Sequence, residues 1–578
     1  MRLYYILAIA LPSLAKNWCP GRVPSSTSRC NNSTFSSKLP TGAYLEKIGE
    51  VKEGECFGED TYSNIFYGIL SNTNTCQTSQ DGAQCNYAVH LPPSCALIVN
   101  MGTYRFGLIM PTTWSGSLMT VGSYSYGGGI NWKDMWTGPK YYNLATLSTD
   151  TGHNSTMPDM RWARGNEQAQ NDWGYRSIDG STRAAKTLLG AYYGQGSLKH
   201  SYFSGCSTGG RQGLKQLEFD QSLFDGLLIG APAWSQTGLL PWLTKLATLN
   251  PPRSSSSIYN NASEFTFIPR QIREACDGLD GTKDHIISRP DLCNITQVAQ
   301  NNLSCGAVGA PSDGCLKPAQ INTLIQLYQN YTITNSTGQF LGFPAPEPGS
   351  DADFQVYLSP DVTIAPDGFD WQWEIDFLGY SSGYSFSDDI IADAEKADPG
   401  RSTARAELTD WAAFNKRGGK LLMYQGLADG IIPPKSTTLY YQAMDSATSG
   451  TSSSFARYYQ IPGMHHCWAS DNDGVEYFAP WNVGGIGQQS QATIAQTESV
   501  IGKSKYDMLK ALMDWVEGKN TPTSITATTW VGTTTTVFRQ RPVCPYPQRA
   551  INTNPNNINS ASSWECRSVR NSLLSDSY

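Results

Sequence analysis

The stretch SYFSGCSTGGRQGLKQLEF predicts a sharp turn from a strand into a helix. Within it, residues 205–209 match the pattern G-x-S-x-G, directly after a β-favouring run and directly before a run with helical spacing. A serine on such a tight strand-to-helix turn needs small neighbours two residues away on either side, because backbone and adjacent elements leave no room for a Cβ. The context favours Ser207 as a nucleophile over an incidental serine in a glycine-rich turn.

Strand-like and helical runs alternate both before and after a long middle block of different character. The strand-like runs are 96–111, 117–124, 197–205, 420–426 and 456–463, and the helical ones are 176–194 and 505–518. This alternation predicts an α/β sheet that carries an insertion at residues 235–405. Together with the G-x-S-x-G turn it predicts an α/β-hydrolase sheet with the insertion as a large lid domain. The catalytic domain would comprise residues 16–234, with a cysteine-rich N-terminal part, and residues 406–578.

The composition and charge of the chain exclude some classes of binding partner. The chain has 578 residues, of which 16% are charged, with 42 Lys and Arg against 49 Asp and Glu and no basic run. We therefore expect no nucleic-acid partner. No stretch reaches the roughly 18 apolar residues of a membrane span, so no membrane partner is expected. The oligomeric state is left open.

The N-terminus and the cysteines predict a secreted, extracellular glycoprotein. Residues 1–15, MRLYYILAIALPSLA, combine an early Arg with a short apolar run and small residues before a cleavage point, as in a signal peptide. The fourteen cysteines include no CxxC pair, which favours disulfides over a zinc site. Eight glycosylation sequons begin at Asn31, Asn32, Asn154, Asn261, Asn294, Asn302, Asn330 and Asn335.

A serine hydrolase of this fold needs an acid after a late strand and a histidine near the C-terminus. Four of the six histidines precede Ser207 or lie in the middle block, which leaves the adjacent pair His465 and His466. Asp429 follows the strand-like run KLLMYQG in a glycine-flanked turn and is the candidate acid. The order serine, aspartate, histidine supports a triad over an unrelated turn aspartate.

The segments GCSTGGRQG, GLADGIIPP and PGMHHCW together resemble the tannase and feruloyl esterase family of secreted serine esterases. The likeness extends to MPTTWSGSLMTVGSYSYGGGINW, DTGHNST and NDWGYRSI, and so covers most of residues 100–235 and 405–520. One departure is Leu427, where family members often carry Trp; it leaves the acid assignment intact.

The resemblance implies a role for each matching residue. Ser207 would be the nucleophile, His466 the general base and then acid, and Asp429 its orienting partner. Cys206 and Cys467, which flank Ser207 and His466, would form the active-site disulfide. Such a bridge favours His466 over His465, because it fixes the residue next to the bridged cysteine and leaves His465 as a loop-wall or substrate-contact residue.

An oxyanion hole needs backbone N–H donors aimed at the developing charge. The N–H of Thr208 is the first candidate. The second would come from the glycine-rich run Gly127 to Gly129, rather than this run being only a flexible turn. The sequence does not decide which of these glycines donates, and Gly128 is taken as the candidate.

The segment between Cys276 and Cys293 contains three aspartates within eight residues. Clustered carboxylates repel unless a hard cation or strong hydrogen bonding neutralises them. The spacing is not that of an EF-hand, but it resembles the calcium loop in the lid of this family, with Asp277, Asp280 and Asp284 as ligands beside the carbonyls of Thr282 and Ile286. We expect a structural Ca²⁺ here; the alternative is an acidic turn closed by a disulfide.

Proximity in sequence predicts three further disulfides, namely Cys276 to Cys293, Cys305 to Cys315 and Cys544 to Cys566. The implied activity is hydrolysis of small phenolic esters or polyphenols, either galloyl esters of tannins or feruloyl and coumaroyl esters of plant cell walls. Chain length and the long lid favour the galloyl branch. Three other classes of protein are alternatives to an esterase. A secreted glycan-binding glycoprotein would share the cysteines and sequons but not the ordered triad. A serine peptidase of this fold would lack the paired cysteines, and an inactive homologue would show a broken triad.

Overall fold

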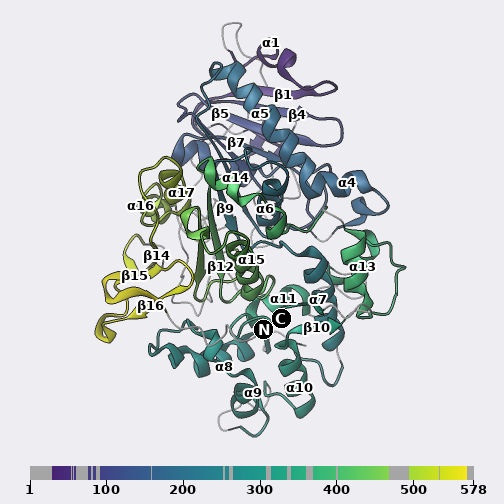
Figure 1. Ribbon diagram of the computed structural model, residues 1–578, viewed down its shortest axis with the longest axis vertical. Coiled ribbons are helices and arrows are strands. Elements are labelled where there is room, and N and C mark those ends of the chain that lie inside the picture. Colours follow the sequence, from purple (N-terminus) through teal and green to yellow (C-terminus); the bar gives the residue numbers. More distant parts are fainter. Residues whose placement is uncertain are drawn as a thin grey trace.

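A nine-stranded mixed sheet forms the centre of the protein, which we describe from a computed structural model (Figure 1). The structure describes residues 29–53, 55, 57–59, 76–79, 82–85, 91–157, 159–251, 254–259, 264–307, 314–334, 340–358, 369–398, 401–467, 494–532 and 534–568. The predicted signal peptide at 1–15 lies outside these residues. In the described part of the chain, no helix is both long and apolar enough to cross a membrane.

The strand order in the sheet is β1-β4-β5-β7-β6-β8-β9-β12-β13. The strands from β7 to β13 in this order pair in parallel, and β1, β4, β5 and β7 pair antiparallel. Their bounds are β1 Tyr44–Val51, β4 Ser94–Asn100, β5 Arg105–Pro111, β6 Ser117–Val121, β7 Ala145–Thr149, β8 His200–Cys206, β9 Gly226–Gly230, β12 Lys420–Gly426 and β13 Ala456–Ile461. The predicted α/β architecture is confirmed.

Helices cover both faces of the parallel strands, which is why these strands read as nearly continuous apolar runs. Successive side chains of a strand point to opposite faces, so Leu228 of β9 packs in one cluster with Leu512 while Leu227 packs in another with Leu214. The helices that flank the sheet are α5 Ser177–Tyr193, α6 Thr208–Phe219, α14 Trp411–Lys416, α15 Pro434–Ala447 and α17 Met508–Val516.

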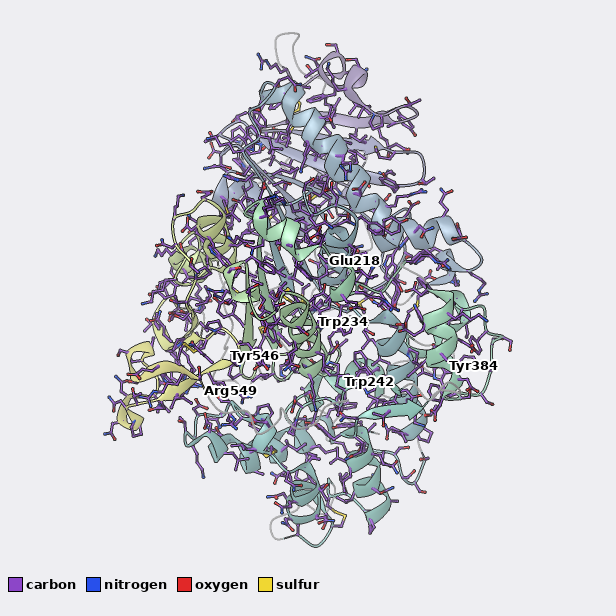
Figure 2. The ribbon with its side chains drawn as sticks, viewed as in Figure 1. Glu218, Trp234, Trp242, Tyr384, Tyr546 and Arg549 are labelled. Carbon is purple, nitrogen blue, oxygen red and sulfur yellow. A yellow bond between two sulfur atoms is a disulfide. The ribbon has the colours of Figure 1, made fainter. Side chains whose placement is uncertain are left out.

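Between β9 and β12 the chain leaves the sheet and forms a mainly helical insertion, drawn in teal below the sheet in Figure 1. It has a core of its own that includes Trp242, Leu324, Phe354 and Trp373. In Figure 2, Trp234 lies where sheet and insertion meet, and Trp242 lies deeper among the insertion helices. The elements are α7 Gln236–Leu249, α8 Glu264–Cys276, α9 Ile295–Val298, α10 Pro318–Leu327, β10 Tyr331–Thr334, β11 Phe340–Phe343, η9 Asp351–Phe354, α11 Gln355–Leu358, α12 Phe369–Asp376 and α13 Asp389–Ala397.

Two hairpins follow near the C-terminus, β14 Ile525–Trp530 with β15 Val537–Val543 and β16 Gln548–Asn552 with β17 Trp564–Ser568. The bridge Cys544–Cys566 closes the second hairpin, and Cys276–Cys293 and Cys305–Cys315 close short loops of the insertion. All three disulfides predicted from proximity are therefore confirmed. A further bridge, Cys30–Cys95, ties the N-terminal segment to β4.

Candidate active site

Ser207 occupies the sharp turn between β8 and α6. Its backbone has φ 60° and ψ −125°, a strained conformation for a residue with a side chain. The flanking glycines are required by contact: a Cβ on Gly205 would lie 2.6 Å from the backbone of Gly209, and one on Gly209 would lie 2.8 Å from the carbonyl oxygen of Ser123. The structure thus places Ser207 on the strand-to-helix turn that the motif predicts.

The bridge between Cys206 and Cys467 is present, with the two Cα atoms 5.9 Å apart. Both cysteines are buried. Because the two cysteines are 261 positions apart in the sequence, the disulfide joins two segments that only the tertiary fold brings together. The disulfide anchors Ser207, which follows Cys206, and His466, which precedes Cys467, to the same covalent link.

His466 faces Asp429. Its Nδ1 lies 2.9 Å from Oδ2 of the fully buried aspartate. Burial by itself lowers the pKa of His466, but attraction and hydrogen bonding to Asp429, with a smaller contribution from Asp353, raise it above its usual value of 6.5. An imidazole held in this way is a general base oriented by a carboxylate.

The Asp429 carboxylate is fixed by donors from its own loop. Oδ1 accepts the backbone N–H of Ile431 at 3.0 Å and of Ile432 at 2.8 Å, and Oδ2 accepts the side-chain amide of Gln425 at 2.7 Å. The hydroxyl of Thr437 in turn donates to Gln425 Oε1 at 2.7 Å, which sets the orientation of that amide. Gln425 and Thr437 are supporting residues that the sequence motifs do not reveal.

His465 has different partners. Its Nδ1 lies 2.9 Å from the carbonyl oxygen of Ala428 and 3.5 Å from Oδ1 of Asp353, a residue of η9 in the insertion. Of the two adjacent histidines it is therefore His466 that is hydrogen-bonded to Asp429. Asp353 is a further site residue that the sequence does not reveal, because it lies in a segment without a recognisable motif.

The glycine-rich loop corrects one prediction. The N–H of Gly128 donates to the carbonyl of Ser155 at 3.0 Å, and that of Gly129 donates to His153 at 2.8 Å. A Cβ on Gly128 would lie 2.2 Å from the His153 carbonyl oxygen. This glycine serves close packing against residues 153–155, and its N–H is not free to stabilise an oxyanion.

His153 explains part of the DTGHNST segment. Its ring stacks on Trp162 with centroids 4.0 Å apart, and Nδ1 lies 2.9 Å from the Ser155 hydroxyl. Burial lowers its pKa to about 3, so the imidazole is neutral at any working pH. It acts as a packing residue beneath the glycine run.

Thr208 is the first residue of α6, where a backbone N–H has no acceptor within its own helix. The loop after β6 passes directly over this helix start, since a Cβ on Gly122 would lie 2.7 Å from Cα of Gly209. Ser123 in this loop donates its N–H to Gln212 Oε1 of α6. The geometry at Thr208 suits an oxyanion donor next to Ser207.

The acidic loop is folded by its own carboxylates. Asp277 accepts the backbone N–H groups of Asp284 at 2.9 Å, of His285 at 3.1 Å and of Ile286 at 3.3 Å. Asp280 accepts the N–H of Thr282 at 2.8 Å. Burial first, and then the nearby carboxylates, raise the pKa of Asp280 to about 6, so negative charge in this loop is only partly compensated.

Part of that compensation comes from the C-terminal hairpins. Arg541 of β15 forms an ion pair with Asp284 and stacks on Trp564 at 3.7 Å, and Arg539 donates to the Asp284 carbonyl at 3.1 Å. Among the described residues, no three His, Cys, Asp or Glu side chains are grouped so as to hold a metal ion. A cation at this loop would have to share Asp284 with Arg541, and calcium stays a prediction.

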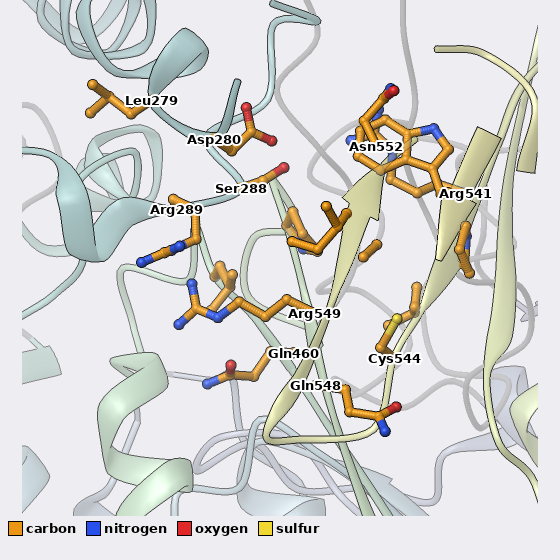
Figure 3. A pocket seen from close by; sticks show the side chains of 17 residues that line it. Leu279, Asp280, Ser288, Arg289, Gln460, Arg541, Cys544, Gln548, Arg549 and Asn552 are labelled. Atoms are coloured by element: carbon orange, nitrogen blue, oxygen red, sulfur yellow. The ribbon is translucent and has the colours of Figure 1, made fainter. Parts of the chain in front are cut away.

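A cavity of about 100 Å³ lies between this loop and the C-terminal hairpins (Figure 3). Arg289 and Arg549 lie side by side in it, and both contact Asp291. Its lining includes neither Ser207 nor His466. The cavity is therefore separate from the proposed reacting groups.

Comparison with known proteins assigns the chain to a family. The model of the family "Tannase and feruloyl esterase" matches residues 100–358 and 378–567. A probable feruloyl esterase B-1 of Aspergillus oryzae is 29% identical over 523 residues, which cover 87% of this chain and 88% of the relative.

Two solved structures extend the likeness. The crystal structure of feruloyl esterase B from Aspergillus oryzae superposes with a TM-score of 0.75 at 25% identity and covers 93% of this chain and 99% of that one. Tannin acyl hydrolase from Aspergillus niger superposes with a TM-score of 0.66 at 18% identity, over 93% and 95% of the two chains, and so shares the fold. The chain belongs to the tannase and feruloyl esterase family and is a carboxylic ester hydrolase.

Proposed function

We propose that the protein hydrolyses esters of phenolic acids through an acyl-enzyme formed on Ser207. His466 takes the proton of the Ser207 hydroxyl as Oγ attacks the ester carbonyl, and it then protonates the leaving alcohol. Asp429 holds the imidazole in the required orientation and stabilises its protonated form. Water, activated by His466, releases the acid and restores the serine.

The single observation that carries this proposal is the shared anchor of the two reacting segments. Ser207 and His466 each adjoin one cysteine of the Cys206–Cys467 bridge, and His466 Nδ1 is hydrogen-bonded to Asp429. The opposite ring nitrogen, Nε2, which lies 3.6 Å from Sγ of Cys467, would accept the proton of the serine. Thr208 would supply one oxyanion donor, and we place the second at residues 124–125 of the loop that adjoins α6, in place of Gly128, because the N–H of Ser123 is donated to Gln212.

For the substrate we favour hydroxycinnamoyl esters, such as feruloyl esters, over galloyl esters. The support is the relative in Aspergillus oryzae, which is named a feruloyl esterase and matches along nearly the whole chain. This reverses the preference for galloyl esters that chain length and the long lid suggest. Galloyl ester hydrolysis remains the second candidate, since the fold is shared with a tannin acyl hydrolase.

The experiment is a comparison of kcat/KM for methyl ferulate and methyl gallate with purified enzyme. A preference of tenfold or more for methyl ferulate supports the proposal, and the opposite preference establishes the galloyl branch. Absence of turnover on both esters, in a folded protein with intact disulfides, would favour a non-catalytic glycan-binding role instead.

We propose further that the protein is secreted and glycosylated, and that loop 277–286 binds a Ca²⁺ ion that stabilises the insertion. The apolar N-terminal segment, the sequons and the disulfides support secretion. For calcium, the support is the three carboxylates of Asp277, Asp280 and Asp284 and a loop already folded around Asp277. The ion would be structural and would take no part in the reaction.

A further inference from the structure

We propose that Asp353, a residue of the insertion, is a positioning residue that holds the acid loop and the histidine loop of the active site together. It lies on η9 and is far in sequence from both loops. The inference rests on the proposed triad and extends it, because it gives the insertion a part in the chemistry in addition to any role in covering the substrate.

The carboxylate of Asp353 contacts the backbone of His466 and that of Gly430, the residue after Asp429. Oδ2 accepts the N–H of Gly430, the residue after the acid, at 3.0 Å. The same oxygen accepts the N–H of His466 at 3.1 Å. One atom of the insertion therefore fixes the distance between two loops that come from the ends of different strands, β12 and β13.

The fit around Gly430 is close. A Cβ at this position would lie 2.5 Å from the carbonyl oxygen of Ser350 and 2.9 Å from Cβ of Asp353. On its other side, the Gly430 carbonyl accepts the hydroxyl of Tyr357, from α11, at 2.8 Å. Segment 350–357 thus contacts both the N–H and the carbonyl of Gly430, the residue after Asp429. A displacement of this segment would therefore move Asp429.

Charge adds to the geometric role. The ionisable groups that face His466 are Asp429 from the acid loop and Asp353 from the insertion, with His465 adjacent in the chain. Burial opposes ionisation of Asp353, but His465 and the donated N–H of Gly430 favour it, and the pKa of Asp353 lies below its usual value. A second carboxylate near the imidazole stabilises its protonated form during the reaction.

The test uses three variants of the full-length protein, Asp353→Asn, Asp353→Glu and Asp398→Asn. Asp398 is the matched control, because its buried carboxylate also accepts two backbone N–H groups, those of Ser402 and Thr403, and is not among the groups that face His466. Turnover of p-nitrophenyl acetate, a small activated ester, is measured beside that of methyl ferulate, together with thermal midpoints and the pH dependence of kcat/KM.

For Asp353→Asn we expect kcat to fall by roughly ten- to a hundred-fold on both esters with little change in KM, since small misplacements of catalytic groups are costly. The acidic limb of the pH profile should move to lower pH, and Asp353→Glu should return it towards that of the wild type. Asp398→Asn should lower the thermal midpoint and leave the limb in place.

Two outcomes would overturn the proposal. In one, folded Asp353→Asn keeps the wild-type kcat and pH limb, which would make Asp353 a purely structural residue. In the other, only KM for methyl ferulate changes, which would make it a substrate contact. If Asp353→Asn does not fold, Asp353→Glu decides, because a displaced carboxylate must lower kcat on both esters. Hydrolysis of p-nitrophenyl acetate without hydrolysis of phenolic esters would refute the substrate assignment and leave this test intact.

Discussion

Nδ1 of His466 lies 2.9 Å from Oδ2 of Asp429, and the attraction between them raises the pKa of the imidazole above 6.5 despite its burial. Only the neutral imidazole can accept the proton of Ser207, so activity must be lost as the pH falls through this raised pKa. We expect the acidic limb of kcat/KM to lie above pH 6.5.

Replacement of Asp429 by Asn tests the same pair. The neutral amide no longer stabilises the imidazolium, so the acidic limb should move to lower pH, and kcat should drop by roughly 10²- to 10⁴-fold because the imidazole loses its orientation. The pH profiles of wild type and variant provide the measurement. A limb that stays in place would show that Asp429 does not contact the titrating group.

Replacement of Ser207 by Ala should lower kcat by at least about 10⁴-fold, because no other group can form the acyl-enzyme. The thermal midpoint should be retained, since Ala keeps the small size that the turn requires. Near wild-type turnover in this variant would refute the nucleophile assignment. The Ser204→Ala variant, three residues earlier on buried strand β8, is a control for general disturbance of this segment.

Removal of the Cys206–Cys467 bridge by a double Cys→Ala change should lower both stability and kcat. The chain-entropy model gives roughly 5 kcal/mol for a loop of this length and roughly 3 kcal/mol for the short loop of Cys305–Cys315. The Cys305→Ala/Cys315→Ala variant is therefore the matched control, with a smaller loss of stability and unchanged kcat at temperatures where it is folded. Denaturant titration and initial rates give the two quantities; equal kcat losses in both variants would contradict a role of the long bridge in catalysis.

Chelation tests the calcium proposal. Removal of a bound ion with EDTA should lower the thermal midpoint, because an ion that binds only the folded state stabilises it by mass action. Catalysis below the midpoint should change little, and Asp280→Asn should show the lower midpoint without chelator. Immediate loss of turnover in a folded protein would make the ion catalytic, and no effect together with no metal in elemental analysis would leave Arg541 as the partner of Asp284.

The parts of the site that follow local rules were predictable. Ser207 stands directly after β8 and Asp429 three residues after the end of β12, and a strand end next to glycines is visible in the sequence. Asp353 was not predictable, because it lies 77 residues from Gly430 and 113 from His466 and meets them only in the folded protein. Gly128 was misassigned because a glycine run suits both an oxyanion loop and close packing, and only the fold places residues 153–155 against it.

The separation of 261 positions between Cys206 and Cys467 also bears on biosynthesis. The ribosome synthesises Cys206 long before Cys467. Cys30 and Cys95 are synthesised earlier still, and either their thiols or the disulfide between them can react with Cys206 in the meantime. Cys206 must therefore either stay reduced until Cys467 has been synthesised, or leave a non-native disulfide by thiol–disulfide exchange. Yield of active enzyme from a heterologous host should accordingly depend on its isomerase capacity more than on its rate of translation.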